Sequence, residues 1–166
     1  MVRAPRPALE RMPPSTRGGP IRLAAFVLLV TGAGLLIGWL NIPGAWYASL
    51  NKPPFNPPNW VFAPVWTGLF VLIAVAGFRS FEREPHGTAA KLWIVQMVLN
   101  FAWSPIFFSF HRMDVALAVI VAMFLAIVAF IWRQWAVDRA AALLFMPYAA
   151  WVAFAAVLNT SLALLN

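Results

Sequence analysis

The sequence predicts an all-α integral membrane protein, a bundle of five transmembrane helices with a long structured loop between helices 1 and 2. Two observations lead to this fold class. Hydrophobic residues make up 63% of the 166 residues and charged residues only 10%, which is more apolar surface than a soluble domain of this size can bury in one core. The twelve Lys and Arg residues fall almost entirely in short segments between long uncharged stretches, as expected for a chain that keeps charge out of the bilayer.

Five uncharged stretches are long enough to cross a hydrocarbon core of about 30 Å, which takes about 20 helical residues. Helices are favoured over barrel strands because the runs are continuously apolar and lipid offers no partner to free backbone groups. Pro64, Pro105 and Pro147 fall within these stretches and are expected to bend them. The predicted spans are Leu23–Asn41, Trp60–Phe78, Leu92–Phe110, Val115–Trp132 and Ala140–Leu165.

The N-terminal segment differs in composition from the rest of the chain. Residues 1–21 are rich in Pro, Arg and Gly, which predicts a basic disordered arm ahead of a transmembrane domain at residues 22–166. The first apolar run could also belong to a signal peptide, but it is longer than the usual apolar core and has no clear small-x-small cleavage site. A basic arm could also bind nucleic acid, but no nucleic-acid-binding module follows it, so no nucleic-acid partner is predicted.

Charge also predicts the orientation of the chain. If the five helices alternate in direction, ten of the twelve Lys and Arg residues lie on one side and only Lys52 and Arg112 lie on the other. The positive-inside rule then places the N-terminus inside and the C-terminus outside for a chain in an inner membrane. The last four helices are joined by short connections, so sequential helices are expected to be antiparallel neighbours.

The connection at residues 42–59 is unlike a flexible linker, which would be rich in Gly and Ser. It contains five prolines, which stiffen it, and three aromatic side chains, Trp46, Tyr47 and Phe55, which give it apolar surface to bury. One interpretation is a lid folded over one end of the bundle. The alternative is an interfacial loop whose aromatic rings lie among lipid head groups.

Seven of the nine tryptophans fall into two groups. Four lie near the ends of the predicted spans, where an interfacial belt explains them: Trp39, Trp93, Trp132 and Trp135. Trp66, Trp103 and Trp151 lie deeper and share helix faces with aromatic, small or polar residues. These faces are Phe62, Trp66 and Phe70 in the second span, Gln96, Asn100 and Trp103 in the third, and Tyr148, Trp151, Ala155, Leu158 and Asn159 in the fifth.

Two interpretations of these faces stay open. They could line a pocket for a flat apolar ligand with a few polar edges, or they could be plain helix packing in which Asn100 joins helices by a hydrogen bond. Gly34 and Gly38 form a small-xxx-small pair, which permits close helix packing or a homodimer.

The residue types that enzymes use are scarce. The chain has no cysteine, its five acidic residues lie in the arm or in loops, and His86 and His111 belong to loops on opposite sides of the predicted bundle. No buried carboxylate pair, nucleophile–base pair or metal site is therefore predicted, and no axial histidine for haem is available inside the bundle. The scarcity of intramembrane charge also argues against a transporter, as does the lack of inverted repeats.

Three stretches resemble the TspO/MBR family, also known as the tryptophan-rich sensory protein or translocator protein family. The stretch from Trp46 to Trp66 is similar to the family pattern W-Y-x-x-L-x-K-P-x-W/F-x-P-P-x-W-x-x-x-P-x-W, and residues 100–108 and 147–159 agree in order and spacing. The resemblance covers about residues 22–160. It implies a five-helix bundle whose first loop caps a cavity.

The resemblance also implies function. Family members bind tetrapyrroles such as protoporphyrin IX and haem as ligands, with no further cofactor required, and some bind sterols and drugs. It implies a receptor or sensor. The alternatives are an enzyme that degrades porphyrin with light and oxygen, and a transporter of porphyrin or sterol. If degradation occurs, Trp66 and Trp151 would be the catalytic residues. After Asn159 this chain has Thr160 and Ser161 in place of the Tyr and Arg of the cholesterol pattern in animal members, so high-affinity sterol binding is not expected. The predicted ligand-binding residues are Tyr47, Trp60, Phe62, Trp66, Asn100, Trp103, Tyr148, Trp151, Ala155 and Leu158.

Overall fold

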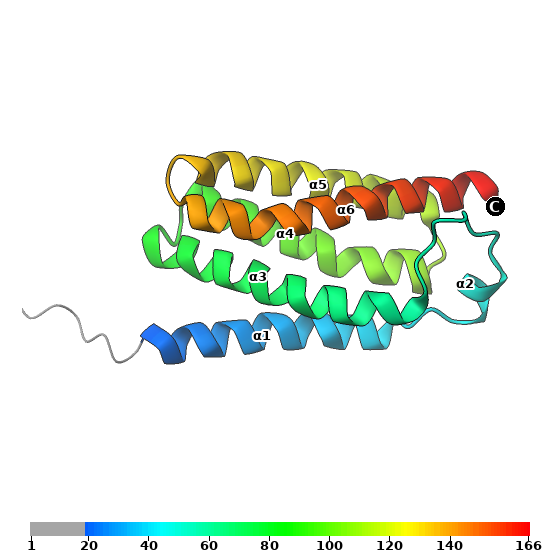
Figure 1. Ribbon diagram of the computed structural model, residues 1–166, viewed down its shortest axis with the longest axis horizontal. Helices are drawn as coiled ribbons and strands as arrows, with labels where there is room; N and C mark the ends of the chain where they lie inside the picture. The colour runs from blue at the N-terminus through cyan, green and yellow to red at the C-terminus, as the bar shows by residue number, and fades with distance from the viewer. Residues whose placement is uncertain (1–18) are drawn as a thin grey trace, which may run out of the picture.

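A computed structural model describes residues 19–166 of the chain; the predicted N-terminal arm lies outside this part except for residues 19–21. The described residues form helices and no strand, which confirms the all-α prediction (Figure 1). Five helical segments are long and apolar enough to cross a membrane. The elements are α1 (Gly19–Leu40), α2 (Ala45–Ser49), η2 (Asn59–Val61), α3 (Phe62–Arg83), α4 (Thr88–Ser104), η3 (Pro105–Ser109), α5 (Met113–Trp135) and α6 (Arg139–Leu165).

The helix ends differ from the predicted ones for local reasons. Helix α1 begins at Gly19, inside the predicted arm, and Pro20 is tolerated in its first turn because backbone N–H groups there have no partner within the helix. Pro64 likewise lies in the first turn of α3 and is not an interior proline as predicted. Pro105 ends α4 and begins the π-helical segment η3. Pro147 alone of the three lies inside an α-helix, in α6.

The long helices run side by side, with α2 and its flanking loop at one end of the bundle (Figure 1). Helix α6 packs on α5 and α3, α5 packs on α4, and α3 packs on α1. Helices α3 and α4 are also in contact, but they meet at fewer points than the other sequential long helices of this part of the chain. The indole of Trp93 lies between them and donates a 2.9 Å hydrogen bond from Nε1 to the carbonyl of Ile73.

The position of Trp93 corrects another prediction. Its side chain is buried rather than placed in an interfacial belt, and the backbone of Gly77 comes so close to the indole that a Cβ there would collide with it. Trp39 and Trp132 are 68% and 81% exposed, as expected of rings that face lipid or the membrane interface.

Opposite the loop end, one buried acidic residue ties the helices together. Asp138 accepts hydrogen bonds from Arg79 at 2.9 Å and Arg83 at 3.2 Å, and it also caps α6 by accepting from the N–H of Ala141. Burial tends to raise the pKa of Asp138, but these hydrogen bonds and the two positive charges together hold it below its ordinary value. Most of the basic residues of the described chain lie at this end, so the structure has the predicted difference in positive charge between the two ends of the bundle. The orientation with the N-terminus inside stays a prediction.

Candidate functional site

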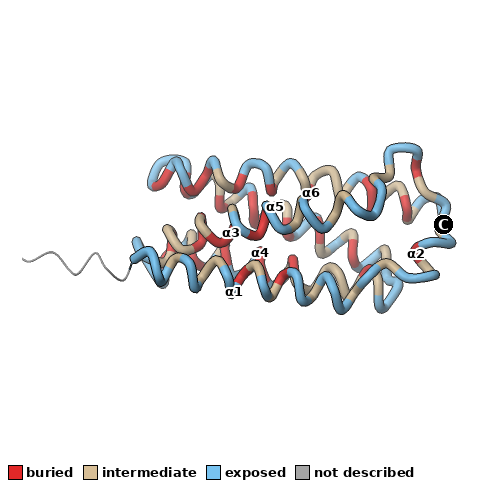
Figure 2. The backbone as a smooth tube through the Cα atoms, turned by 60° about the horizontal axis from the view of Figure 1, so that its bottom comes forward, coloured by how far each residue is buried: buried red, intermediate tan, exposed pale blue. Residues whose placement is uncertain are grey.

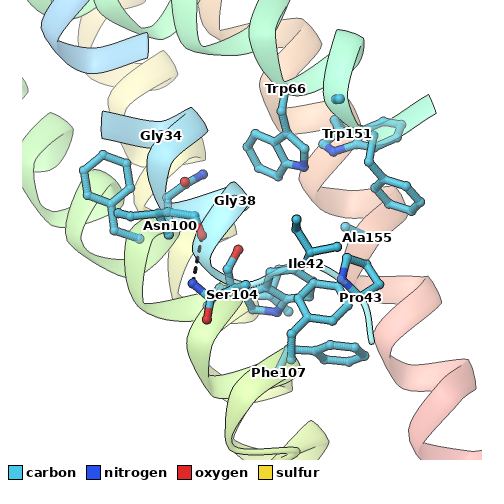
Figure 3. Close-up of a pocket in the computed structure, with 18 of the residues that line it drawn as sticks. Gly34, Gly38, Ile42, Pro43, Trp66, Asn100, Ser104, Phe107, Trp151 and Ala155 are labelled. Atoms are coloured by element: carbon cyan, nitrogen blue, oxygen red, sulfur yellow. Dashed lines mark hydrogen bonds between the residues drawn. The ribbon is translucent and has the colours of Figure 1, made fainter. Parts of the chain in front are cut away.

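A cavity of about 450 Å³ lies among the five long helices, in the half of the bundle nearest the loop. Its size falls within the range of small-molecule sites. Figure 3 shows Trp66, Trp151, Asn100 and Phe107 directed toward it from different helices. Figure 2 shows that buried residues are concentrated between the helices, with α1 the most exposed of them.

Helix α3 supplies the aromatic stripe that the sequence predicted. Phe62, Trp66 and Phe70 all line the cavity, since residues four apart lie on one face of a helix. The rings of Trp66 and Phe70 stack with centroids 5.4 Å apart. Phe62 meets the indole of Trp151 edge to face at 5.9 Å, which connects α3 to the opposite wall.

Helix α6 forms that opposite wall. Trp151, Ala155, Leu158 and Asn159 line the cavity, on the face predicted from their spacing. The small side chain of Ala155 leaves space beside the indole of Trp151 (Figure 3). The wall is therefore apolar, with one amide at its loop end.

The third wall comes from α4 and the π-helical segment η3. Asn100 and Trp103 line the cavity together with Ser104, Phe107 and Phe108. The rings of Trp103 and Phe107 stack with centroids 5.1 Å apart. A π-helix presents side chains at a different angle from an α-helix, and such segments are frequent at functional sites.

Few polar atoms interrupt this apolar lining. Asn100 Nδ2 donates a 2.9 Å hydrogen bond to the hydroxyl of Tyr148, which lies behind the wall and donates in turn to the sulfur of Met123 at 3.2 Å. Asn159 Nδ2 donates to the carbonyl of Met113 at 3.0 Å. The Oδ1 of Asn159 and the Nε1 of Trp103 are buried without a hydrogen-bond partner.

The loop between α1 and α3 closes the end of the cavity, which agrees with the lid interpretation. Tyr47 is buried against the rings of Phe107 and Phe108, at 6.3 and 5.5 Å, and lines the cavity. Its hydroxyl donates to Asn56 Oδ1 at 2.9 Å, and Lys52 Nζ lies 4.9 Å from its ring centroid. Burial raises the pKa of Tyr47 and outweighs the opposite effect of the bond to Asn56.

Two further contacts hold this loop, which we call the lid (residues 42–59), to the bundle. The side chain of Asn166 accepts from the N–H of Asn51 at 2.9 Å and donates to its carbonyl at 3.1 Å. The indole of Trp46 stacks on the imidazole of His111 with centroids 4.1 Å apart. The lid is thus fixed to the end of α6 and to the turn before α5.

Eight of the ten predicted ligand-binding residues line the cavity, and two do not. Trp60 is 74% exposed in the short η2 helix, where its ring faces away from the bundle interior. Tyr148 is fully buried behind the lining, where it contacts the lining residues Asn100, Met123 and Trp66. The lining residues of the predicted set are Tyr47, Phe62, Trp66, Asn100, Trp103, Trp151, Ala155 and Leu158.

The contribution of α1 was not predicted: residues of α1 between Gly34 and Trp39, and Asn41 just after the helix, line the cavity. The spacing of Gly34 and Gly38 was the available signal, since both glycines line the cavity. A Cβ on Gly34 would collide with the ring of Phe70, so this glycine permits close packing of α1 on α3. A Cβ on Gly38 would meet nothing within 4 Å.

Within residues 19–166, no group of three or more His, Asp or Glu side chains could hold a metal ion. His86 and His111 are exposed and lie outside the long helices. The chemistry available at the cavity is therefore that of indole and phenyl rings with a few amide and hydroxyl groups.

Comparison with known proteins agrees with this architecture. The model of the TspO/MBR family matches residues 25–165. The chain is 40% identical over 139 residues to the tryptophan-rich sensory protein of Cereibacter sphaeroides, covering 84% of this chain and 88% of that protein. It is 39% identical over 133 residues to protein CrtK of Rhodobacter capsulatus, covering 78% and 83%. It is 38% identical over 145 residues to the translocator protein of Ovis aries, covering 79% and 82%.

Proposed function

Because the chain belongs to the TspO/MBR family, we propose that it is a membrane receptor or sensor that binds a tetrapyrrole such as protoporphyrin IX or haem. The ligand occupies the cavity beneath the lid, and its binding regulates porphyrin metabolism or a stress response. The protein itself needs no further cofactor in this proposal.

One observation carries the proposal: tryptophans from four helices line a single capped cavity inside the membrane-spanning bundle. Large flat rings favour offset-stacked or edge-to-face contact with aromatic side chains. Trp66 and Trp151 offer such surfaces from the neighbouring helices α3 and α6, and Asn100 of α4 offers a polar group in the same lining. A tetrapyrrole has both the flat apolar body and the few polar edges that this lining favours.

Titration of the purified protein with protoporphyrin IX tests the proposal. Binding should quench tryptophan fluorescence and shift the porphyrin absorbance, and the double variant Trp66→Phe plus Trp151→Phe should bind at least tenfold more weakly. The matched control is Trp132→Phe plus Trp135→Phe, which removes two indoles that do not line the cavity. Equal affinity in both double variants would show that the site is elsewhere.

A second function is favoured by the same two indoles. Trp66 and Trp151 both line the cavity, so each could donate an electron to a bound, light-excited porphyrin while molecular oxygen acts as the oxidant. Illumination of the complex in air should then produce a bilin-like absorbance. The product should be lost in the Trp66→Phe plus Trp151→Phe variant and kept in the Trp132→Phe plus Trp135→Phe control. If the complex is stable under light and oxygen, the protein acts as a receptor only.

A further inference from the structure

Helix α1 borders the cavity but is held to the bundle mainly on one side. It packs on α3 and meets α4 at few points. Only Val30 and Gly34 of its 22 residues are buried. The wall between α1 and α4 is therefore the least packed side of the cavity.

One face of α1 both lines the cavity and is exposed. Leu35, Gly38 and Trp39 recur at the spacing of a single helix face, and Ile42 follows just after the end of the helix. All four line the cavity, and the three large side chains are 41%, 68% and 62% exposed. The side of α1 that faces α3 is a different one, because Phe26 and Leu29 line an outer groove together with residues of α3. The cavity thus reaches the outer surface on the α4 side of α1.

The seam between α1 and α4 is narrow but weakly closed. Figure 3 shows Gly34 and Gly38 of α1 close to Asn100 and Ser104 of α4. A Cβ on Gly38 would meet no atom within 4 Å, so no side chain fills the gap at this position. Among the described residues, a single side-chain hydrogen bond joins α1 or the residue after it to the α4–η3 segment, from Ser109 Oγ to Asn41 Oδ1 at 2.6 Å.

The lid end is closed more firmly than the seam. Its loop is bound by the two Asn166 hydrogen bonds to Asn51, by the Trp46–His111 stack and by the burial of Tyr47. A ligand that came from water would have to break several of these contacts. A ligand that came from the bilayer would have to separate one hydrogen bond and two helices that barely touch.

We propose that the seam between α1 and α4 is a lateral doorway, with the Ser109–Asn41 hydrogen bond as its latch, and that the ligands of the cavity are apolar or amphiphilic molecules already dissolved in the bilayer. The inference rests on the proposed function in assuming that the cavity binds a ligand. It adds the route of entry, and with it the class of molecule that can arrive.

A reversible crosslink tests the doorway, because the chain has no cysteine of its own. The variant Asn41→Cys plus Ser109→Cys is placed in lipid nanodiscs and mixed with protoporphyrin IX, and tryptophan quenching is followed in time. Oxidation should slow association and dissociation at least tenfold and leave the equilibrium affinity unchanged, and a reductant should restore both rates. Asn51→Cys plus Asn166→Cys, which crosslinks the lid to α6, should leave the rates within twofold.

Two single substitutions test the same seam without a crosslink. Ser109→Ala removes the latch and should speed association about two- to fivefold, since one hydrogen bond contributes about 1 kcal/mol. Its control is Ser161→Ala, which removes a hydrogen bond within α6 only. Gly38→Leu should slow association by blocking the gap. Gly32→Leu, on the same helix with equally open space and no part in the cavity lining, should not.

The outcomes separate the doorway from the proposed function. Unchanged rates in the oxidised seam variant and in Gly38→Leu, or slowing by the lid crosslink instead, would overturn the doorway while porphyrin binding stood. If the wild type bound no porphyrin, the proposed function would fail. The doorway would then be judged by a small brominated alkane added to the same nanodiscs, because oxidation of the seam variant should slow the rate at which the alkane quenches tryptophan.

Discussion

Asn100 on α4 and Tyr148 on α6 are joined by a 2.9 Å hydrogen bond in which the amide of Asn100 donates to the phenol oxygen. The tyrosine is fully buried and the asparagine lines the cavity. Tyr148 therefore sets the orientation of the amide that a ligand would meet, although it does not touch the cavity itself.

Replacing Tyr148 with Phe should release this amide. We expect the unfolding free energy in detergent to fall by about 1 kcal/mol, and porphyrin to bind more weakly, because Asn100 is no longer held in one orientation. A double-mutant cycle with Asn100→Ala measures the coupling between the two residues. Strictly additive effects would contradict the role assigned to Tyr148.

Gly34 is the second position at which packing shapes the cavity. Its backbone lies so close to the ring of Phe70 that a Cβ would collide with it, and Phe70 stacks on Trp66. Gly34→Ala should destabilise the protein by about 1–3 kcal/mol through overpacking, and the displaced ring should shift the tryptophan emission spectrum.

Gly38→Ala provides the comparison, because a Cβ there meets nothing within 4 Å. It should not lower the midpoint of thermal unfolding, since Ala favours a helix more than Gly does, and it should leave the emission spectrum unchanged. If the two alanine variants had equal stability, α1 would pack on α3 less closely than the structure shows.

Much of the fold could be predicted because charge marks the ends of membrane helices. The five spans follow from uncharged runs, and Phe62, Trp66 and Phe70 follow from helical spacing. The role of α1 could not be predicted this way. Its apolar residues are spread evenly around the helix. The spacing of Gly34 and Gly38 marks one side of α1, but it does not tell which part packs on α3 and which borders the cavity.

Three aromatic residues show where position along the chain is a poor guide. Trp93 lies near the start of α4, yet it is buried because Gly77 on α3 leaves room for its indole. Trp60 and Phe62 are two residues apart in one motif, but only Phe62 lines the cavity, because Trp60 belongs to the η2 turn before α3 begins. Such outcomes depend on neighbouring helices and on local turn geometry, which spacing alone does not give.

Asn166 tests how the lid is held. Its side chain bonds both the N–H and the carbonyl of Asn51. Asn166→Ala should free this part of the lid, and amide hydrogen exchange at residues 50–56 should become at least tenfold faster. Exchange within α5 should not change, and a rate increase spread over the whole bundle would instead indicate general destabilisation.

Asp138 makes the stability of the bundle depend on pH. Burial tends to raise the pKa of its carboxyl group, but hydrogen bonds from Arg79 and the Ala141 N–H, with the charges of Arg79 and Arg83, hold it below the ordinary value of 3.8. A carboxyl group with a lowered pKa stabilises the folded state above its unfolded pKa, and this contribution is lost as the pH falls through the folded pKa. The stabilisation should therefore be complete at neutral pH, should begin to weaken below about pH 4 and should be lost as the pH falls through the lowered folded pKa.

Thermal unfolding in detergent at pH 7 and pH 3 measures this effect. At pH 7, Asp138→Asn should lower the unfolding free energy by about 1–2 kcal/mol, because it removes the charge from the α6 cap and from the two arginines. At pH 3 the wild type should have lost part of its advantage over Asp138→Asn, since the pH then lies below the unfolded pKa of the carboxyl group. Asp114→Asn, which breaks an exposed pair with Arg112, should change little at either pH. An Asp138→Asn variant whose stability fell with pH as steeply as the wild type's would assign the acid sensitivity to other carboxyl groups.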